Sequence, residues 1–237
     1  MHWHTEIHGS VATLRYDRSP HNILTLEAVR GLRRAWEAVE QRSDINVVVI
    51  AGANGQFLLH TEPSEMDSLL DTAASIPSWA QRRAAFAFTA VGETLPRRPW
   101  LRRLLDGADN LPGVPDTTML EAWIVQRSIE LSDKVSVAAI DGSALGGGFE
   151  TALCCDYRLV ADKPDTRLGL PGILVGMLPG FGGTARIRNL IGTAQTRQLP
   201  LRGDALTPAA AFRLCLVNES IEADDFDAKV NAITQRL

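Results

Sequence analysis

The sequence predicts an α/β fold, and three features lead to that prediction. Apolar residues recur at three- and four-residue steps from Leu24 to Arg42, the pattern of an amphipathic helix. A short β-branched run from Val47 to Ile50 has apolar residues on both faces, as in a parallel strand covered by helices. Strands and helices of these kinds alternate along the chain, which indicates βαβ units.

The composition is that of an ordinary globular domain, and we expect residues 1–237 to form a single one. Hydrophobic residues make up 45% of the chain and charged residues 22%. The formal net charge of −4 argues against nucleic-acid binding, which rests on a basic surface. The odd number of cysteines argues against a disulfide framework. We find no signal peptide and no apolar run of membrane-spanning length, and therefore expect a soluble, cytoplasmic protein with no membrane partner.

In the N-terminal half, we expect a strand from Val11 to Tyr16 before the first helix, with Thr25 as the N-cap of that helix. The strand from Val47 to Ile50 follows. From about 67 to 117 the pattern weakens, and five prolines interrupt short helical pieces. We expect this segment to be an irregular, partly helical excursion on the same domain.

In the C-terminal half the periodic patterns return. The expected elements are a helix from Met119 to Glu130, a buried strand from Val135 to Ile140, a short helix from Glu150 to Cys154, a strand from Tyr157 to Ala161 and a helix that starts near Thr184.

A glycine triplet, Gly146 to Gly148, stands between a buried strand and a helix in the run DGSALGGGFE from Asp141 to Glu150. Glycine lets the backbone approach a ligand closely, and N–H groups at the start of a helix attract negative charge. The triplet therefore predicts a site for an anion or a developing oxyanion. The spacing fits neither a P-loop nor G-x-G-x-x-G. The alternative is that the triplet only permits tight packing.

A second glycine-rich run, LGLPGILVGMLPGFGGT from Leu168 to Thr184, mixes glycine and proline with large apolar residues. We expect an irregular, buried segment that walls a pocket. Arg186 follows it at the start of a helix, where it could hold the loop through carbonyl groups or a carboxylate.

Together these motifs resemble the crotonase superfamily, the enoyl-CoA hydratase/isomerase group. The similarity runs from about Val11 to Ile221 and includes several separated motifs in the same order. It implies a spiral of β-β-α units, with the C-terminal helical segment usual in the family shortened or missing. It also implies assembly into homo-oligomers, as trimers or hexamers.

The resemblance further implies an acyl-CoA thioester as the substrate, with coenzyme A as part of that substrate and no other cofactor or metal. Two backbone N–H groups would bind the thioester oxygen, one on Gly147 and one on Thr61 in the segment Phe57 to Pro63. The residues that would contact the substrate are Leu59, His60, Thr61, Gly146, Gly147, Leu170 and Gly172.

Hydratases of this family use two glutamates, and the resemblance assigns the first to Glu150, as acid and base. The second position is Gly172 in this chain. Isomerisation needs only one proton-shuttling base, so it suffers less from that loss than hydration does. The alternative function is a catalytically degenerate homologue that binds acyl-CoA or regulates without hydratase turnover. For Glu150 itself, the alternative role is to cap the first turn of its own helix.

One further candidate lies at the N-terminus, where His2, His4, Glu6 and His8 alternate along an expected strand. This spacing could hold a metal ion. We favour the simpler interpretation, a polar outer face of the strand, because the segment is terminal and exposed.

Overall fold

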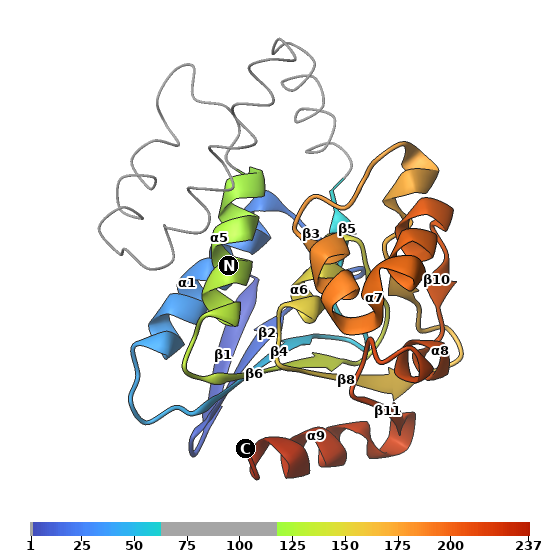
Figure 1. Ribbon diagram of the computed structural model, residues 1–237. Coiled ribbons are helices and arrows are strands. Elements are labelled where there is room, and N and C mark those ends of the chain that lie inside the picture. The colour runs from blue at the N-terminus through green and yellow to red at the C-terminus, as the bar shows by residue number, and fades with distance from the viewer. Residues whose placement is uncertain (1, 63–117) are drawn as a thin grey trace, which may run out of the picture.

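The computed structural model describes residues 2–62 and 118–237 (Figure 1). The expected excursion at about 67–117 lies outside these residues. The largest sheet has six strands in the order β1-β2-β4-β6-β8-β11. These strands are β1 Trp3–His8, β2 Val11–Tyr16, β4 Val47–Gly52, β6 Val135–Ile140, β8 Tyr157–Asp162 and β11 Glu219–Glu222.

In this sheet β1 and β2 form an antiparallel pair, and every other neighbouring pair is parallel. The strands β2, β4, β6 and β8 are each followed by a short strand that joins a smaller sheet, β3-β5 or β10-β9-β7. The short strands are β3 Ile23–Leu24, β5 Leu59–Thr61, β7 Ala144–Leu145, β9 Leu168–Gly169 and β10 Ala205–Leu206. This repetition of long strand, short strand and helix confirms the expected spiral of β-β-α units.

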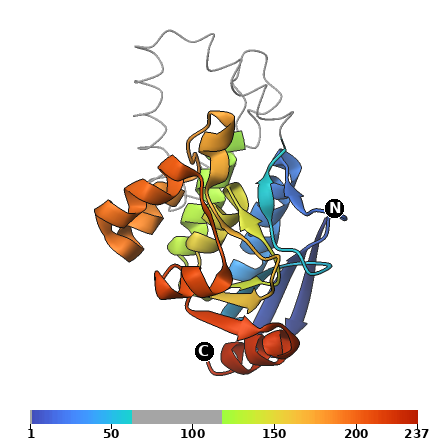
Figure 2. The same ribbon diagram turned by 90° about the vertical axis from the view of Figure 1, so that its right-hand side faces the viewer.

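The helices lie on both sides of the large sheet. In both views α1, α5, α6 and α7 lie on one side and α9 on the other (Figures 1 and 2). The helical segments are α1 Leu26–Glu40, α5 Thr118–Glu130, α6 Gly147–Leu153, η2 Pro171–Val175, α7 Gly183–Arg202, α8 Pro208–Arg213, η3 Ala223–Asp225 and α9 Phe226–Thr234. None of the helices within the described ranges is long and apolar enough to cross a membrane.

The apolar residues of the sheet divide between two clusters, one on each face. All six residues of β4 are buried, as expected for a parallel strand covered on both sides. Val48 and Ile50 belong to the cluster beneath α1, α5 and α6, whereas Val47 and Val49 pack on the α9 side. The alternation of side chains along a strand thus builds two cores from one sheet.

The first helix and the helix after the glycine triplet have other boundaries than the sequence predicts. The first helix spans Leu26–Glu40, because Leu24 pairs in β3 and Thr25 caps the helix by accepting a hydrogen bond from the Ala28 N–H. The expected helix from Glu150 to Cys154 instead begins at Gly147. The glycine triplet is therefore partly helical, which glycine disfavours only weakly when tertiary contacts support the turn.

Candidate active site

The three glycines of the triplet lie in different structural environments. Gly146 precedes α6 with φ +53° and ψ −126°, a conformation that residues with a side chain rarely adopt. A Cβ on Gly148 would lie 1.8 Å from the carbonyl oxygen of Leu58, so α6 packs directly on the chain leading into β5. A Cβ on Gly147 would lie 2.9 Å from the Phe181 ring and 3.2 Å from the Leu24 side chain. Tight packing thus explains Gly148, while Gly147 lies between two apolar side chains.

The N–H of Gly147 is the first of α6, so no carbonyl of that helix can accept from it. Other backbone N–H groups at this end of the helix have acceptors. The Gly146 N–H donates to the carbonyl oxygen of Gly169 at 2.9 Å, and the Glu150 N–H donates to the carbonyl oxygen of Gly146 at 2.9 Å. For the Gly147 N–H we find no acceptor among residues 2–62 and 118–237. Its hydrogen-bonding capacity is therefore not used within this part of the structure.

The strand β5 brings the second expected donor close to this point. It pairs in parallel with β3, placing Leu59 opposite Ile23 and Thr61 opposite Leu24, with a register shift between the two pairs. Leu24 is the residue whose side chain flanks Gly147. A Cβ on Gly146 would lie 3.1 Å from the Cβ of His60, so β5 passes directly beside the triplet. The backbone of Thr61 is therefore adjacent to the start of α6.

Glu150 lies one helical turn after Gly147 and is only 3% exposed. Its Oε1 accepts hydrogen bonds from the N–H groups of Phe181, at 2.9 Å, and Gly183, at 2.7 Å. Burial disfavours the charged carboxylate and raises the pKa of Glu150 to about 7, although these two hydrogen bonds and the charge of Arg186 act in the opposite direction. For Oε2 we find no hydrogen-bond donor within the described ranges. Backbone N–H groups thus hold one of the two carboxyl oxygens of Glu150.

This arrangement corrects the alternative role considered for Glu150. The side chain does not cap α6, whose N-cap is Gly146 with no side-chain hydrogen bond. It accepts instead from Gly183, the first residue of α7. A Cβ on Gly183 would lie 2.6 Å from the Cγ of Glu150, so this close approach requires glycine.

Arg186 holds the loop that contacts Glu150, as its position in the sequence suggested. Its Nη1 donates to the carbonyl oxygen of Phe181 and, at 2.8 Å, to Oε1 of Gln126, and its Nε lies 2.6 Å from Oε1 of Glu130. Both a carbonyl group and a carboxylate are therefore its partners. Burial lowers the pKa of Arg186, but nearby negative groups, Glu130 and Glu150 among them, raise it. The net effect is a raised pKa. The guanidinium is charged throughout the working pH range.

The glycine-rich segment after β9 begins beside the triplet, but it is not buried along its length as expected: Leu174 and Val175 are each 71% exposed. Leu170 is buried and directly follows Gly169, the acceptor of the Gly146 N–H. Gly172 lies in η2, and a Cβ placed on it would point at the carbonyl oxygen of Met177, 3.0 Å away. At the position where the resemblance places a second glutamate, this chain has Gly172, which packs against the backbone of Met177 within a turn.

Sequence reasoning missed the residues that orient Glu150 and the start of α6. Phe181 and Gly183 act through backbone N–H groups, which leave no signature in residue type. Gln126 and Thr151 are buried polar residues, 1% and 2% exposed, that link α5 to α6. The only available signal was a polar residue at a buried position of each helix, which periodicity alone marks weakly.

The N-terminal histidines do not form a metal site. No group of three or more His, Cys, Asp or Glu within residues 2–62 and 118–237 is placed to hold a metal ion. His4, Glu6 and His8 are exposed, and Trp3 packs on α1, with its Nε1 donating to the carbonyl oxygen of Ala28 at 2.8 Å. This confirms the interpretation as a polar outer face for β1.

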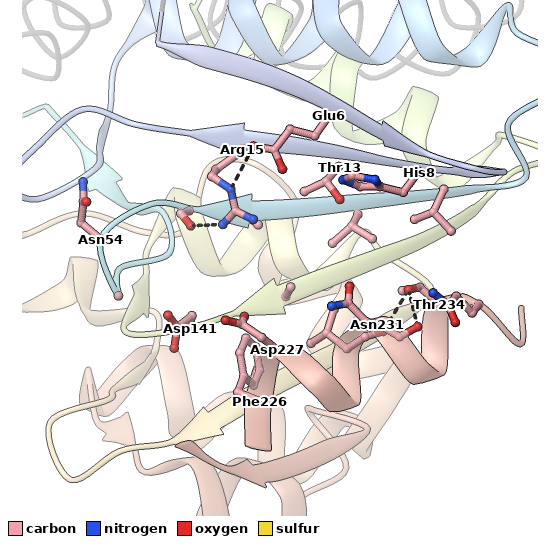
Figure 3. Close-up of a pocket in the computed structure, with 18 residues that line it drawn as sticks. Glu6, His8, Thr13, Arg15, Asn54, Asp141, Phe226, Asp227, Asn231 and Thr234 are labelled. Carbon is pink, nitrogen blue, oxygen red and sulfur yellow. Dashed lines mark hydrogen bonds and ion pairs between the residues drawn. The ribbon is translucent and has the colours of Figure 1, made fainter. Parts of the chain in front are cut away.

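A large open cleft lies elsewhere, between the sheet and α9. It has a volume of about 710 Å³, and Figure 3 shows Glu6 and Arg15 from the β1–β2 pair facing Asp227 and Asn231 of α9. Its floor is formed by residues of the α9-side core, such as Ala51. None of the residues expected to bind or act on the substrate lines this cleft, so the cleft and the candidate site are on opposite faces of the sheet.

Comparisons with known proteins agree with this fold and this set of motifs. A family model described as Enoyl-CoA hydratase/isomerase matches residues 110–237, more than half of the chain. The chain is 39% identical over 113 residues to a crotonyl-CoA hydratase of Syntrophomonas wolfei, which covers 48% of the chain and 43% of that protein. It is 28% identical over 215 residues to a glyoxysomal fatty acid beta-oxidation multifunctional protein MFP-a of Cucumis sativus, covering 91% of the chain and 24% of that protein. The chain therefore spans less than half the length of these curated relatives.

Solved structures share the fold. An enoyl-CoA hydratase/carnithine racemase from Magnetospirillum magneticum superposes with a TM-score of 0.76 at 24% identity, covering 100% of this chain and 74% of that one. An enoyl-CoA hydratase from Bacillus anthracis gives a TM-score of 0.74 at 20% identity, covering 100% and 76%. With the β-β-α spiral, these matches lead to one conclusion: the chain belongs to the enoyl-CoA hydratase/isomerase family of the crotonase superfamily.

Proposed function

We propose that this chain acts on an acyl-CoA thioester, with the N–H groups of Gly147 and Thr61 binding the thioester oxygen and Glu150 moving a proton. The observation that carries this proposal is the placement of Glu150. Its carboxyl group is buried, has a pKa near 7, and lies one helical turn from a backbone donor with no acceptor among the described residues. A base with such a pKa is half ionised near neutral pH, where proton transfer in both directions is efficient.

The chemistry follows from polarising the thioester carbonyl. Two N–H groups aimed at its oxygen stabilise negative charge there, which acidifies the hydrogens on the α-carbon and, in an unsaturated chain, on the γ-carbon. Glu150 Oε2 takes one of these protons, and the C–H electron pair moves into the carbon chain and onto the oxygen. Return of the proton to the other carbon moves the double bond by one position. All atoms and electrons are conserved, and no redox partner is needed.

Hydration requires more acid–base groups at the site than isomerisation does. Adding water across an enoyl double bond requires one group to deprotonate water and a proton source for the α-carbon. Glu150 alone could serve both roles in turn, but Gly172 supplies no second carboxylate. We therefore propose double-bond isomerisation as the main reaction, with hydration slower.

The substitution at Gly172 also favours a second candidate. A family member with one of two glutamates lost could bind acyl-CoA, or regulate an active homologue, without turnover. Assembly into a homotrimer or hexamer and a cytoplasmic location stay predictions under either function.

The test is turnover of 3-enoyl-CoA thioesters by isomerisation and of crotonyl-CoA and longer 2-enoyl-CoA thioesters by hydration. For Glu150→Gln we expect a loss of about 10³-fold in kcat, within the usual range for a general acid–base group. The matched control, Glu222→Gln, removes an exposed carboxylate from β11 and should leave the rate unchanged. Binding of the thioesters without any turnover would instead support the degenerate homologue, and equal losses in both variants would exclude Glu150 as the base.

A further inference from the structure

A chain of buried and partly buried hydrogen bonds connects three helices behind the candidate site. Arg186 of α7 donates to Oε1 of Gln126 of α5 at 2.8 Å, and Nε2 of the same glutamine donates to Oγ1 of Thr151 at 3.2 Å. Thr151 in turn donates to the carbonyl oxygen of Gly147 at 2.8 Å. The chain therefore ends on the first residue of α6, the residue with the available N–H.

The same arginine has a second branch. It donates to the carbonyl oxygen of Phe181, whose N–H holds Oε1 of Glu150. One guanidinium thus contacts both the loop that orients the carboxyl group and the chain that reaches Gly147. Glu130 accepts from the Nε of Arg186 and fixes the guanidinium from α5.

The direction of each bond in this chain is determined by chemistry. Arginine can only donate, so Gln126 must present its carbonyl oxygen to Arg186 and its amide nitrogen to Thr151. The hydroxyl of Thr151 accepts that bond and has its single proton left for Gly147. Because Gln126 and Thr151 are buried, breaking the bond between them leaves a polar group without a partner.

We propose that Arg186, Gln126 and Thr151 form a positioning network that fixes the oxyanion-binding end of α6 relative to Glu150. This inference rests on the proposed function and deepens it. None of the three residues is assigned contact with the substrate. Their role is to hold Gly147 in the orientation in which its N–H meets the thioester oxygen as charge develops there.

A purely structural role is the competing explanation, and the chain supplies a matched control for it. Thr234 of α9 is 3% exposed and donates through Oγ1 to the carbonyl oxygen of Val230 at 2.9 Å. Thr151 is 2% exposed and makes the same bond to the residue four positions earlier. The two threonines have the same local hydrogen bond and burial, but only Thr151 lies next to the candidate site.

The experiment compares Thr151→Val, Thr151→Ser and Thr234→Val. Both valine variants should lose stability in urea titration, and Thr151→Val should lose more, because it also leaves the amide of Gln126 without its acceptor. Thr151→Val should lower kcat about tenfold with KM within about twofold, because a displaced donor is felt most in the transition state. Thr151→Ser keeps the hydroxyl and should restore kcat, and Thr234→Val should keep the wild-type kcat.

Isotope-edited infrared spectroscopy of bound butyryl-CoA, labelled at the thioester carbonyl, gives a readout that does not depend on turnover. Hydrogen bonds to the oxygen lower the stretching frequency, and Thr151→Val should move it back toward the value in water while Thr234→Val does not. Equal kcat and equal frequency in the two valine variants would overturn the network. A frequency shift without any turnover in the wild type would refute the proposed activity but support the network, and a wild type that binds no thioester would refute both.

Discussion

The two faces of the six-stranded sheet differ in how far their polar groups are exposed to water. On the α9 face, charged side chains such as Glu6 and Asp227 border an open cleft and are exposed to water (Figure 3). On the α6 face, the carboxyl group of Glu150 is buried and held by backbone N–H groups. The α9 face has the open cleft, and the α6 face has the group whose pKa is displaced toward neutrality.

The proposed function therefore rests on burial together with fixed donors, and not on open volume. Water solvates the groups of the cleft and competes with any ligand for them. The carboxyl group of Glu150 has no such solvation, so its protonation state depends on Phe181, Gly183 and Arg186. The following predictions test this contrast, starting with the largest expected effect.

The strongest consequence of burial is a dependence of stability on pH. The pKa of Glu150 is raised in the folded state from the ordinary 4.5 to about 7, so between these values the folded protein keeps a proton that the unfolded chain releases. Stability contributed by this group is therefore complete below about pH 4.5 and falls by about 3 kcal/mol as the pH rises to 7 and above. Glu150→Gln is uncharged and can keep both accepted hydrogen bonds, so it should be more stable than the wild type by up to that amount at pH 8.

Urea titration at pH 5 and pH 8 measures this difference. The gain of Glu150→Gln over the wild type should be much smaller at pH 5. Asp227→Asn, on the open α9 face, should show almost the same stability relative to the wild type at both values. A gain for Glu150→Gln that does not change with pH would mean that burial does not raise the pKa of this carboxyl group.

Substitutions at the two adjacent glycines of α6 should affect different properties, turnover at Gly147 and stability at Gly148. In Gly147→Ala the new methyl group meets the Phe181 ring and the Leu24 side chain, which can shift, so we expect a loss of about 1 kcal/mol in stability. Turnover should fall about 10²-fold, because the displaced N–H no longer meets the thioester oxygen. In Gly148→Ala the methyl group meets the backbone of Leu58, which cannot shift easily, so the main loss should be in stability. Similar losses of turnover per folded molecule in both variants would contradict this division.

Restoring a carboxylate to the α6 face should increase hydration. Gly172→Glu requires a shift of only a few tenths of an ångström from Met177, and its φ lies outside the left-handed region. We expect hydration of crotonyl-CoA to rise about tenfold, less than an evolved acid–base group supplies. Gly172→Gln has the same size without the charge and should not increase the rate. Equal hydration rates for the two variants would show that the carboxylate at this position does not reach the substrate.

The smallest effect concerns the charge behind Glu150. Arg186 lowers the pKa of Glu150, so Arg186→Met should raise it and move the increase of kcat/KM with pH to higher pH. Arg186→Lys keeps the charge and should preserve more of the wild-type profile. Arg188→Met removes an exposed charge two residues later on α7 and should leave the profile in place. An unchanged profile in Arg186→Met would exclude electrostatic control from this position.

Several elements could be predicted from the sequence because their signals are local. The β-branched run of β4, the apolar stripe of α1 and the Thr25 cap depend on neighbours within a few residues. The glycine triplet and Glu150 were also evident, since a strand, three glycines and an acidic residue follow one another directly. The boundary of α6 was wrong by three residues, because glycine's low helix propensity hides a turn that contacts with β5 stabilise.

By itself, then, the sequence determined the family through its motifs: a strand-to-helix turn rich in glycine, followed by a carboxylate, in an order that resembles one family. Only the tertiary structure decided how that carboxylate is held. The donors from Phe181 and Gly183 come from 31 and 33 residues away, and Gln126 reaches Thr151 across 25. Backbone N–H donors cannot be recognised from residue type, because every residue except proline has one. The contacts among α5, α6 and α7 depend on how their apolar faces pack, which no local pattern specifies.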